Sequence, residues 1–203
     1  MNYYEFPSTS IFSAAKASVA LRPNVFIQVS ALNGYLETLE LPGARWVVQF
    51  TFRPMNDDDR SELEGFFAAV RGQANRVIMP HPKKKQLRGT MRGSPQVAVA
   101  VSQLEEAIII SNPTQANKTI EQGDVFRVDN QLYMVTERLV LDGSGSGTVH
   151  VSPPCRTPHT VGAALTIERP TATFMLGQTE VPIPWEPGVS PSFDVTFVET
   201  FGT

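Results

Sequence analysis

A single well-formed helix signal, in a chain whose other patterns are those of strands, most constrains the fold. Residues 56–59 (NDDD) supply N-cap candidates, and Asp59 with Glu62 three residues later forms a potential capping box. Gly72 is the stop signal. One apolar face follows from the spacing i, i+3, i+4 and i+7 of Leu63, Phe66, Phe67 and Val70. We therefore expect one helix whose apolar face packs on a sheet.

Strand patterns flank this helix on both sides. Apolar and polar residues alternate through Val25, Ile27 and Val29, and again through residues 46–50. Asn33-Gly34 is a hairpin turn signal, and Pro42-Gly43 marks a second turn. The strand RVIMP follows the helix and stops at Pro80-His81-Pro82. The helix and these strands predict one α+β domain.

A second run of short strands begins after the basic, turn-rich segment HPKKKQLRGTMRGSP. It holds four or five strands, including a hairpin through Asp129-Asn130, which is typical of a small barrel or sandwich. Strands around Phe174 and from Phe193 to Phe201 complete the chain. We predict a mainly β (α+β) fold. Residues 1–82 and 167–203 form a domain with the helix packed on its sheet, and residues 83–166 form an inserted, small, OB-like β-barrel.

Composition excludes several classes of protein. The chain has 203 residues, 41% of them hydrophobic, and a formal net charge of -3, without the basic excess of a nucleic-acid-coating protein. Cys155 is the only cysteine, so no disulfide forms within the chain. The N-terminus MNYYEFPSTS lacks the pattern of a signal peptide, and no apolar run reaches the roughly 20 residues that span a bilayer. We expect a soluble protein made in a cytoplasm, with no membrane and no nucleic-acid partner.

Few residues have the spacing that a catalytic, metal-binding or phosphate-binding site requires. Cys155 and His159 have a Cys-x3-His spacing, but neither His81 nor His150 belongs to a second ligand pair, so we expect no zinc site. The loop DGSGSGT lacks the lysine and the following helix of a phosphate loop. The acidic run NDDD lacks the alternating carboxylates of a calcium loop. We therefore predict no catalytic, metal or cofactor-binding residues and no cofactor.

A basic cluster and a set of aromatic residues on strands indicate what lies on the surface and what lies in the core. The cluster PKKKQLR with Arg92 has no interleaved aromatic residues, so we interpret it as a solvated interdomain linker. The aromatic residues on strands are expected mostly in the core, although some could anchor interfaces. They are Phe12, Phe26, Trp46, Phe50, Phe52, Phe174, Phe193, Phe197 and Phe201.

The order of these segments resembles the distal tail proteins of long-tailed bacteriophages and related tail-tip proteins of the baseplate. The segments are RWVVQFTF, LEGFFAAVRGQ, NRVIMPHP, GDVFRVDNQLYMVTE, GSGTVHVSPPCR and TATFMLGQTEVPI. The resemblance covers the chain from about residue 25 to the C-terminus. It implies a belt domain, built from a sheet or split barrel with one helix, and a second β domain of OB-like or galectin-like type.

The resemblance also implies a function. Proteins of this family are virion structural proteins without catalytic residues, and they form a hexameric ring at the tail tip. The ring joins the tail tube protein to the tail hub and receptor-binding proteins, after assembly in the host bacterial cytoplasm.

Two other functions stay open. The inserted barrel could bind a carbohydrate or an oligonucleotide through a face that includes Phe126 and Tyr133. An enzyme would require His81, Cys155 or His159 to meet a carboxylate in one pocket.

Overall fold

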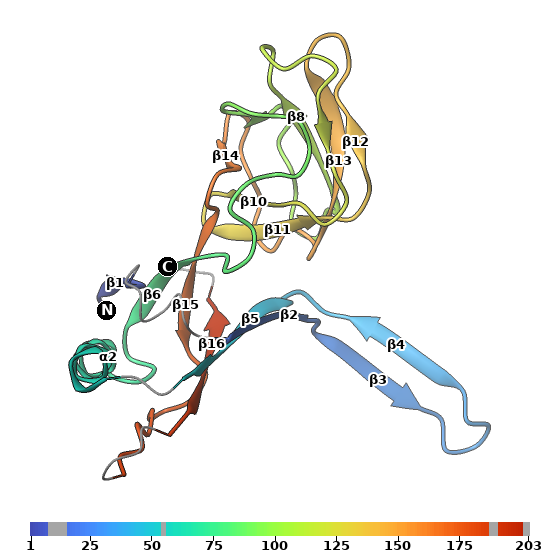
Figure 1. Ribbon diagram of the computed structural model, residues 1–203. Coiled ribbons are helices and arrows are strands. Elements are labelled where there is room, and N and C mark those ends of the chain that lie inside the picture. The colour runs from blue at the N-terminus through green and yellow to red at the C-terminus, as the bar shows by residue number, and fades with distance from the viewer. Residues whose placement is uncertain (8–15, 54–55, 187–190, 201–203) are drawn as a thin grey trace. The chain divides into compact units, whose positions relative to one another are not determined.

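The computed structural model describes residues 1–7, 16–53, 56–186 and 191–200, and the chain divides into two compact units (Figure 1). The first unit comprises Met1–Ala20, Trp46–Pro82 and Thr171–Thr203, and the second comprises Leu21–Arg45 and Lys83–Pro170. The chain returns to the first unit at Thr171, slightly later than the sequence placed it. Residues 21–45, expected in the first domain, group with the second unit.

Six strands of the first unit form one sheet in the order β1-β6-β15-β16-β5-β2. Strand β1 is parallel to β6, whereas the pairings β6–β15, β15–β16 and β16–β5 are antiparallel. The strands are β1 (Tyr3–Glu5), β2 (Lys16–Arg22), β5 (Arg45–Phe52), β6 (Arg76–Pro80), β15 (Thr171–Leu176) and β16 (Phe193–Glu199).

The core face of this sheet is rich in phenylalanine. Phe50, Phe52 and Phe197 are buried there, and the ring of Phe6 stacks on Phe50 at 5.0 Å. Helix α2 (Asp57–Val70) covers this face, because Phe67 meets the ring of Phe52 edge-on at 6.4 Å. The predicted packing of one helix on the sheet is therefore confirmed.

The ends of α2 are set by local hydrogen bonds. Asn56 is the N-cap, since its side-chain oxygen accepts the N–H of Asp59 at 2.7 Å. The predicted capping box of Asp59 with Glu62 is wrong, because Asp59 already lies inside the helix. At the other end Arg71, with φ 54°, is left-handed and its N–H donates to the carbonyl of Phe67. The left-handed residues Arg71 and Gly72 (φ 59°) end the helix together.

The aromatic predictions have mixed outcomes. Trp46, Phe50, Phe52, Phe174 and Phe197 are buried as expected, and Phe193 is half-buried. Phe12 and Phe201 lie outside the described residues. The prediction was wrong for Phe26, which is 57% exposed. On the helix, Leu63, Phe67 and Val70 are buried and Phe66 is half-buried.

The second unit contains a nearly closed, six-stranded antiparallel barrel. The strand order is β14-β10-β11-β13-β8-β7, and an antiparallel bridge between Gln96 and Ala164 brings the ends of the order together. The strands are β7 (Gln96–Val97), β8 (Ala107–Ser111), β10 (Val125–Val128), β11 (Gln131–Val135), β13 (Ser146–Ser152) and β14 (Leu165–Thr166). A short pair, β9 (Thr119–Ile120) and β12 (Leu139–Val140), accompanies them.

The predicted mainly β fold with one packed helix and a small barrel is confirmed. The turn predicted at Asp129-Asn130 joins β10 and β11, and Asp129 adopts φ 50° there. With six antiparallel strands, the barrel departs from the five-stranded arrangement that is typical of OB folds.

Candidate functional site: an exposed apolar hairpin

A two-stranded hairpin between β2 and β5 is the least buried element among the described residues. Strands β3 (Val25–Val29) and β4 (Leu36–Glu40) are antiparallel. Their turn closes where Asn33-Gly34 predicted it: the N–H of Ser30 donates to the carbonyl of Tyr35, and Gly34 adopts φ 69°. We call residues 25–41 the arm.

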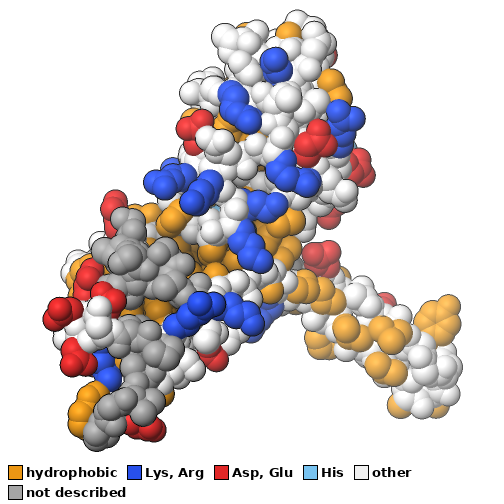
Figure 2. Space-filling view, viewed as in Figure 1, with side chains coloured by type: hydrophobic (Ala, Val, Ile, Leu, Met, Phe, Trp, Pro, Cys, Tyr) orange, Lys and Arg blue, Asp and Glu red, His pale blue; other side chains and the backbone are white. Residues whose placement is uncertain are grey.

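The arm carries a dense set of exposed apolar side chains. All ten residues of its two strands are exposed. Among the described residues, 17 large hydrophobic side chains are exposed, and nine of them lie in the arm. Figure 2 shows hydrophobic side chains gathered over this hairpin. They are Val25, Phe26, Ile27, Val29, Leu32, Tyr35, Leu36, Leu39 and Leu41. Concentrations of this kind mark interaction surfaces.

The strand register assigns these side chains to both faces of the arm. Val29 pairs with Leu36, Ile27 pairs with Thr38 and Val25 pairs with Glu40, so one face presents four apolar side chains with one threonine and one glutamate. The opposite face presents Phe26 beside Leu39, and the polar pair of Gln28 and Glu37. A hairpin with one face on a core and one face in water would have a polar second face. The arm instead carries exposed apolar side chains on both faces, more densely on the face of Val25, Ile27 and Val29.

Covering the arm is energetically favourable. An isolated two-stranded hairpin is marginally stable in water, because it has no third strand or helix against which to bury its side chains. Complete burial of one Val, Leu, Ile or Phe side chain contributes about 1.5–3 kcal/mol. Leu32 is 99% exposed and Tyr35 is 76% exposed, so almost all of this free energy is still to be gained at the tip.

The base of the arm is held by two hydrogen bonds. The side-chain amide of Asn24 donates to the carbonyl of Pro42 at 2.8 Å, and the N–H of Leu41 donates to the carbonyl of Asn24 at 2.8 Å. Gly43 adopts φ 113°, so the predicted turn at Pro42-Gly43 is a bend between β4 and β5. The arm carries Glu37 and Glu40 but no lysine or arginine. It is therefore an apolar ribbon with a small negative charge.

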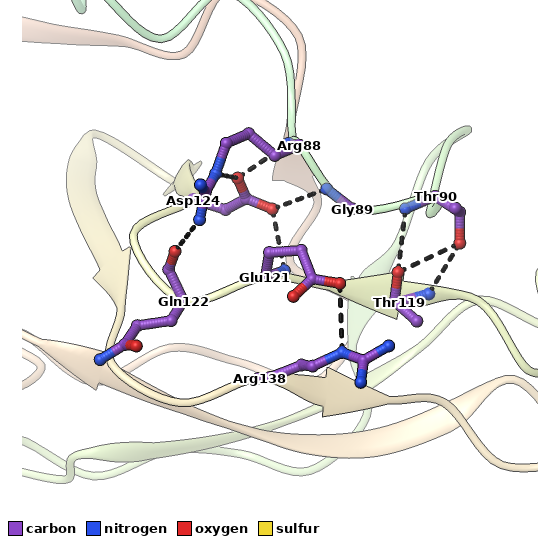
Figure 3. A network of polar contacts seen from close by, with 8 residues as sticks. All are labelled: Arg88, Gly89, Thr90, Thr119, Glu121, Gln122, Asp124 and Arg138. Carbon is purple, nitrogen blue, oxygen red and sulfur yellow. Dashed lines mark hydrogen bonds and ion pairs between the residues drawn. The ribbon is translucent and has the colours of Figure 1, made fainter.

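A polar network in the barrel explains the basic segment that precedes it. The buried carboxylate of Asp124 accepts the N–H groups of Arg88 at 2.8 Å, Gly89 at 3.1 Å and Glu121 at 3.0 Å (Figure 3). Gly89 must be a glycine, since a Cβ there would lie 2.1 Å from the carbonyl oxygen of Thr119. The network fixes this segment against the barrel.

The interpretation of this segment as a solvated linker was therefore wrong from Leu87 onward. Leu87 and Met91 belong to the buried core of the barrel. Lys83, Lys85, Arg88 and Arg92 are exposed, as a charged surface requires.

A second polar network lies in the barrel core, where the sequence placed a possible Cys–His pair. The hydroxyl of Tyr133 donates to Oε1 of Gln131 at 2.8 Å, and the same hydroxyl lies 2.8 Å from Nε2 of His159. The other ring nitrogen, Nδ1, lies 2.6 Å from the carboxylate of Asp129. Arg156 also donates to Oε1 of Gln131, from its N–H and its Nε. The network joins the β10–β11 turn to residues 156–159.

Most side chains of this network are enclosed, and its outer end reaches the surface. Tyr133 and Cys155 are 0% exposed and His159 is 1% exposed, whereas the Asp129 side chain is 58% exposed. Burial raises the pKa of the Cys155 thiol, which disfavours the reactive thiolate. His159 meets a carboxylate, as an enzyme would require, and the contact joins the β10–β11 turn to the barrel core.

The other predicted motifs have structural roles. The run NDDD begins α2, and Asp142 in the DGSGSG loop accepts N–H groups of Ser144 and Ser146. The hydrogen bond from the Ser144 hydroxyl, followed by these backbone bonds, lowers the pKa of Asp142. Among the described residues, no three His, Cys, Asp or Glu side chains gather closely enough to hold a metal ion.

The aromatic pair proposed for a ligand-binding face of the barrel does not reach the surface. Phe126 is 1% exposed and Tyr133 is 0% exposed, and both belong to the barrel core. They are thus unable to stack on a sugar or a base. Neither of them supports a binding module.

Sequence comparisons add no relative from which a function could be carried over. No protein-family model matches the chain, and no curated protein matches its sequence significantly. In the part of the chain that the structure describes, no helix is long and apolar enough to cross a membrane. The arm is therefore the feature on which a functional proposal has to rest.

Proposed function

We propose that this chain is a structural protein that assembles with copies of itself into a ring, as a tail-tip component of a long-tailed phage. The observation that carries the proposal is the arm, which has nine exposed apolar side chains, six of them on the two faces of its paired strands. A partner of the same chain supplies the missing cover in every subunit. The resemblance to distal tail proteins, stated on the sequence, agrees with this role.

A ring follows from the kind of contact that an arm makes. The arm of one subunit and the surface that accepts it are different parts of the chain, so the contact is heterologous. Heterologous contacts repeat head to tail and produce a closed ring when the rotation permits. In the tail tip, this ring would join the tail tube protein to the tail hub and receptor-binding proteins. It would act as a scaffold, without catalysis.

The native mass of the chain tests self-assembly directly. One chain has a mass of 22.3 kDa, so a hexamer has six times that mass, about 134 kDa. We expect light scattering on a size-exclusion column to give the hexamer mass, and negative-stain images of the same fractions to show sixfold rings. Chains of 22.3 kDa at every concentration up to the solubility limit would overturn the proposal.

A pair of variants tests whether the arm carries the assembly. Ile27→Asp adds a charge to the arm at a side chain that is 57% exposed, and Val140→Asp makes the same change at a barrel side chain that is 53% exposed. We expect Ile27→Asp to abolish the ring and Val140→Asp to leave it intact. Equal effects of the two substitutions would exclude the arm as the assembly surface.

A further inference from the structure

The hydrogen-bond network of the barrel core determines how many protons the ring of His159 carries. Two donors of Arg156, its backbone N–H at 3.2 Å and its Nε at 3.3 Å, face one atom of the Gln131 amide. Both donors lack lone pairs to accept with, so the amide atom that they face is the oxygen, Oε1. The Gln131 amide nitrogen donates to the hydroxyl of Thr157, which agrees with this orientation. The amide of Gln131 is therefore fixed by its neighbours.

The hydroxyl of Tyr133 carries the next hydrogen of the network. It lies 2.8 Å from Oε1 of Gln131, which has no hydrogen, so the hydroxyl hydrogen points to that oxygen. Only lone pairs of the hydroxyl oxygen then face Nε2 of His159, at 2.8 Å. A contact of this length between two polar atoms needs a hydrogen between them, and only Nε2 can supply it. His159 is therefore protonated at Nε2.

The other ring nitrogen of His159 faces a carboxylate. Nδ1 lies 2.6 Å from Oδ2 of Asp129, so a second proton lies between these two atoms. The Asp129 side chain is 58% exposed, and water stabilises the charged form of a carboxyl group. The second proton therefore belongs to Nδ1. Both ring nitrogens are donors, which is the state of the imidazolium cation.

Asp129 and Arg156 are the charged residues of this network. Asp129, in the β10–β11 turn, is the anion in direct contact with the ring. The cation of Arg156 is separated from the ring by Gln131 and Tyr133, and backbone carbonyls accept its remaining donors. An anion in hydrogen-bond contact favours the charged ring. Its attraction offsets the cost of burying the imidazolium.

The other titratable groups around the network are neutral or act at its edge. The phenol of Tyr133 keeps its proton, because it donates that proton to Gln131. The thiol of Cys155 contacts the same hydroxyl and is neutral, since burial raises its pKa. Glu105 acts on this thiol from the segment that follows Val101, whose backbone pairs with that of His159. Asp129 is therefore the group in this network that holds the second proton on the ring.

We infer that the folded barrel holds His159 as an imidazolium paired with Asp129, and that this pair is a proton-dependent clasp between the β10–β11 turn and residues 156–159. Loss of the second proton leaves one contact of the network without a hydrogen. An ordinary histidine loses this proton near pH 6.5, so above that pH the folded barrel binds one proton more than the unfolded chain. The clasp contributes fully just below that pH and is lost as the pH rises. The inference does not depend on self-assembly.

Solid-state nitrogen-15 NMR of chains with labelled histidine counts the ring protons, in a monomer or in a ring. Protonated and unprotonated ring nitrogens have well-separated chemical shifts, and the signals lost in His159→Gln assign this residue. We expect both nitrogens of His159 to be protonated at about pH 7.5, where an ordinary histidine is about 90% neutral. A neutral His159 ring at that pH would overturn the inference.

Asp129→Asn tests whether the carboxylate holds the proton. Asp129 is left-handed, with φ 50°, and asparagine adopts this conformation readily, so the turn is kept. The amide has no negative charge, so we expect the His159 ring of this variant to be neutral at about pH 7.5. Asp142→Asn, which alters a loop carboxylate outside the network, is the control and leaves both ring protons in place. An imidazolium that persists in Asp129→Asn would overturn the clasp.

The pH dependence of barrel stability gives a second readout. Chains are equilibrated in urea at different pH values, and the Cys155 thiol is pulse-labelled at one fixed pH to measure the fraction of open barrels. We expect the ratio of folded to unfolded barrels to fall roughly tenfold between about pH 6.5 and pH 8, and Asp129→Asn to lack this decrease. Equal pH dependences of the unsubstituted chain and Asp129→Asn would contradict the inference. The native mass in light scattering tests the proposed function separately.

Discussion

Replacement of Asp124 by asparagine tests whether one carboxylate holds the entry segment onto the barrel. Oδ1 accepts the N–H of Arg88, and Oδ2 accepts the N–H groups of Gly89 and Glu121. Asparagine has the same shape but one oxygen, so it can keep at most the two donors on one side. The third N–H then faces an amide that is itself a donor. Because Asp124 is 0% exposed, water does not replace the lost acceptor.

The magnitude follows from these three bonds. A buried donor that loses its acceptor costs about 1–3 kcal/mol, and the remaining two bonds change from charged to neutral, with a smaller loss for each. We expect Asp124→Asn to lower the free energy of unfolding of the barrel by about 3 kcal/mol. With a urea dependence of about 1–3 kcal/mol per molar, the midpoint of unfolding falls by about 1–3 M.

Tryptophan and cysteine lie in different units, so unfolding of the barrel can be measured separately from unfolding of the sheet. Trp46 and Trp185 belong to the first unit, whereas Cys155 is buried in the barrel core. Pulsed labelling of the Cys155 thiol in urea reports opening of the barrel, and tryptophan fluorescence reports the sheet. The matched control is Asp142→Asn, which alters an exposed loop carboxylate that also accepts backbone N–H groups.

We expect the control to move the labelling midpoint far less than Asp124→Asn does. Equal midpoints for the two variants would refute the reasoning. The buried carboxylate would then contribute no more than an exposed one.

Two further substitutions test individual contacts. Gly72→Ala places a Cβ 2.2 Å from the carbonyl oxygen of Thr179 at a residue with φ 59°, so we expect a loss of about 2 kcal/mol or more in the tryptophan-detected transition. Gly65→Ala, in open space within α2, is the control, and we expect it to be neutral or to stabilise by up to about 1 kcal/mol. Tyr133→Phe removes a hydroxyl shared by two buried polar side chains, so we expect the Cys155-labelling transition to lose about 1–3 kcal/mol. An unchanged labelling midpoint would show that this hydroxyl contributes nothing to the core.

The parts of the fold that the sequence predicted are those with local causes. Helix α2 was predictable because its cap, its apolar spacing and its stop all lie within 56–72. The turn at Asn33-Gly34 was predictable for the same reason. The capping residue was misplaced because four consecutive polar residues offered several candidates. Only the hydrogen bond from the Asp59 N–H to Asn56 distinguishes them.

Long-range contacts account for what the sequence did not reveal. Asp124 lies 36 residues from Arg88, and His159 lies 30 residues from Asp129, so no local pattern connects either pair. The packing of Leu87 into the barrel was hidden because its neighbours are lysine, glutamine and arginine. Sequence alternation identified the strand Val25–Val29, but alternation does not show whether a strand is covered.

The arm did leave one signal in the sequence, and its meaning depends on the rest of the structure. Phe26 interrupts the alternation of this strand, because it places an apolar side chain on the face opposite Val25 and Ile27. In the single chain this strand has one neighbour and all of its residues are exposed. The same chain buries its phenylalanines in the sheet and barrel cores efficiently, so poor patterning does not explain the exposure. The pattern is that of a core, and in one chain that core is missing. A second subunit that completes it makes burial of the arm part of assembly, so we expect the amide groups of the hairpin to become protected from hydrogen exchange only as the ring closes.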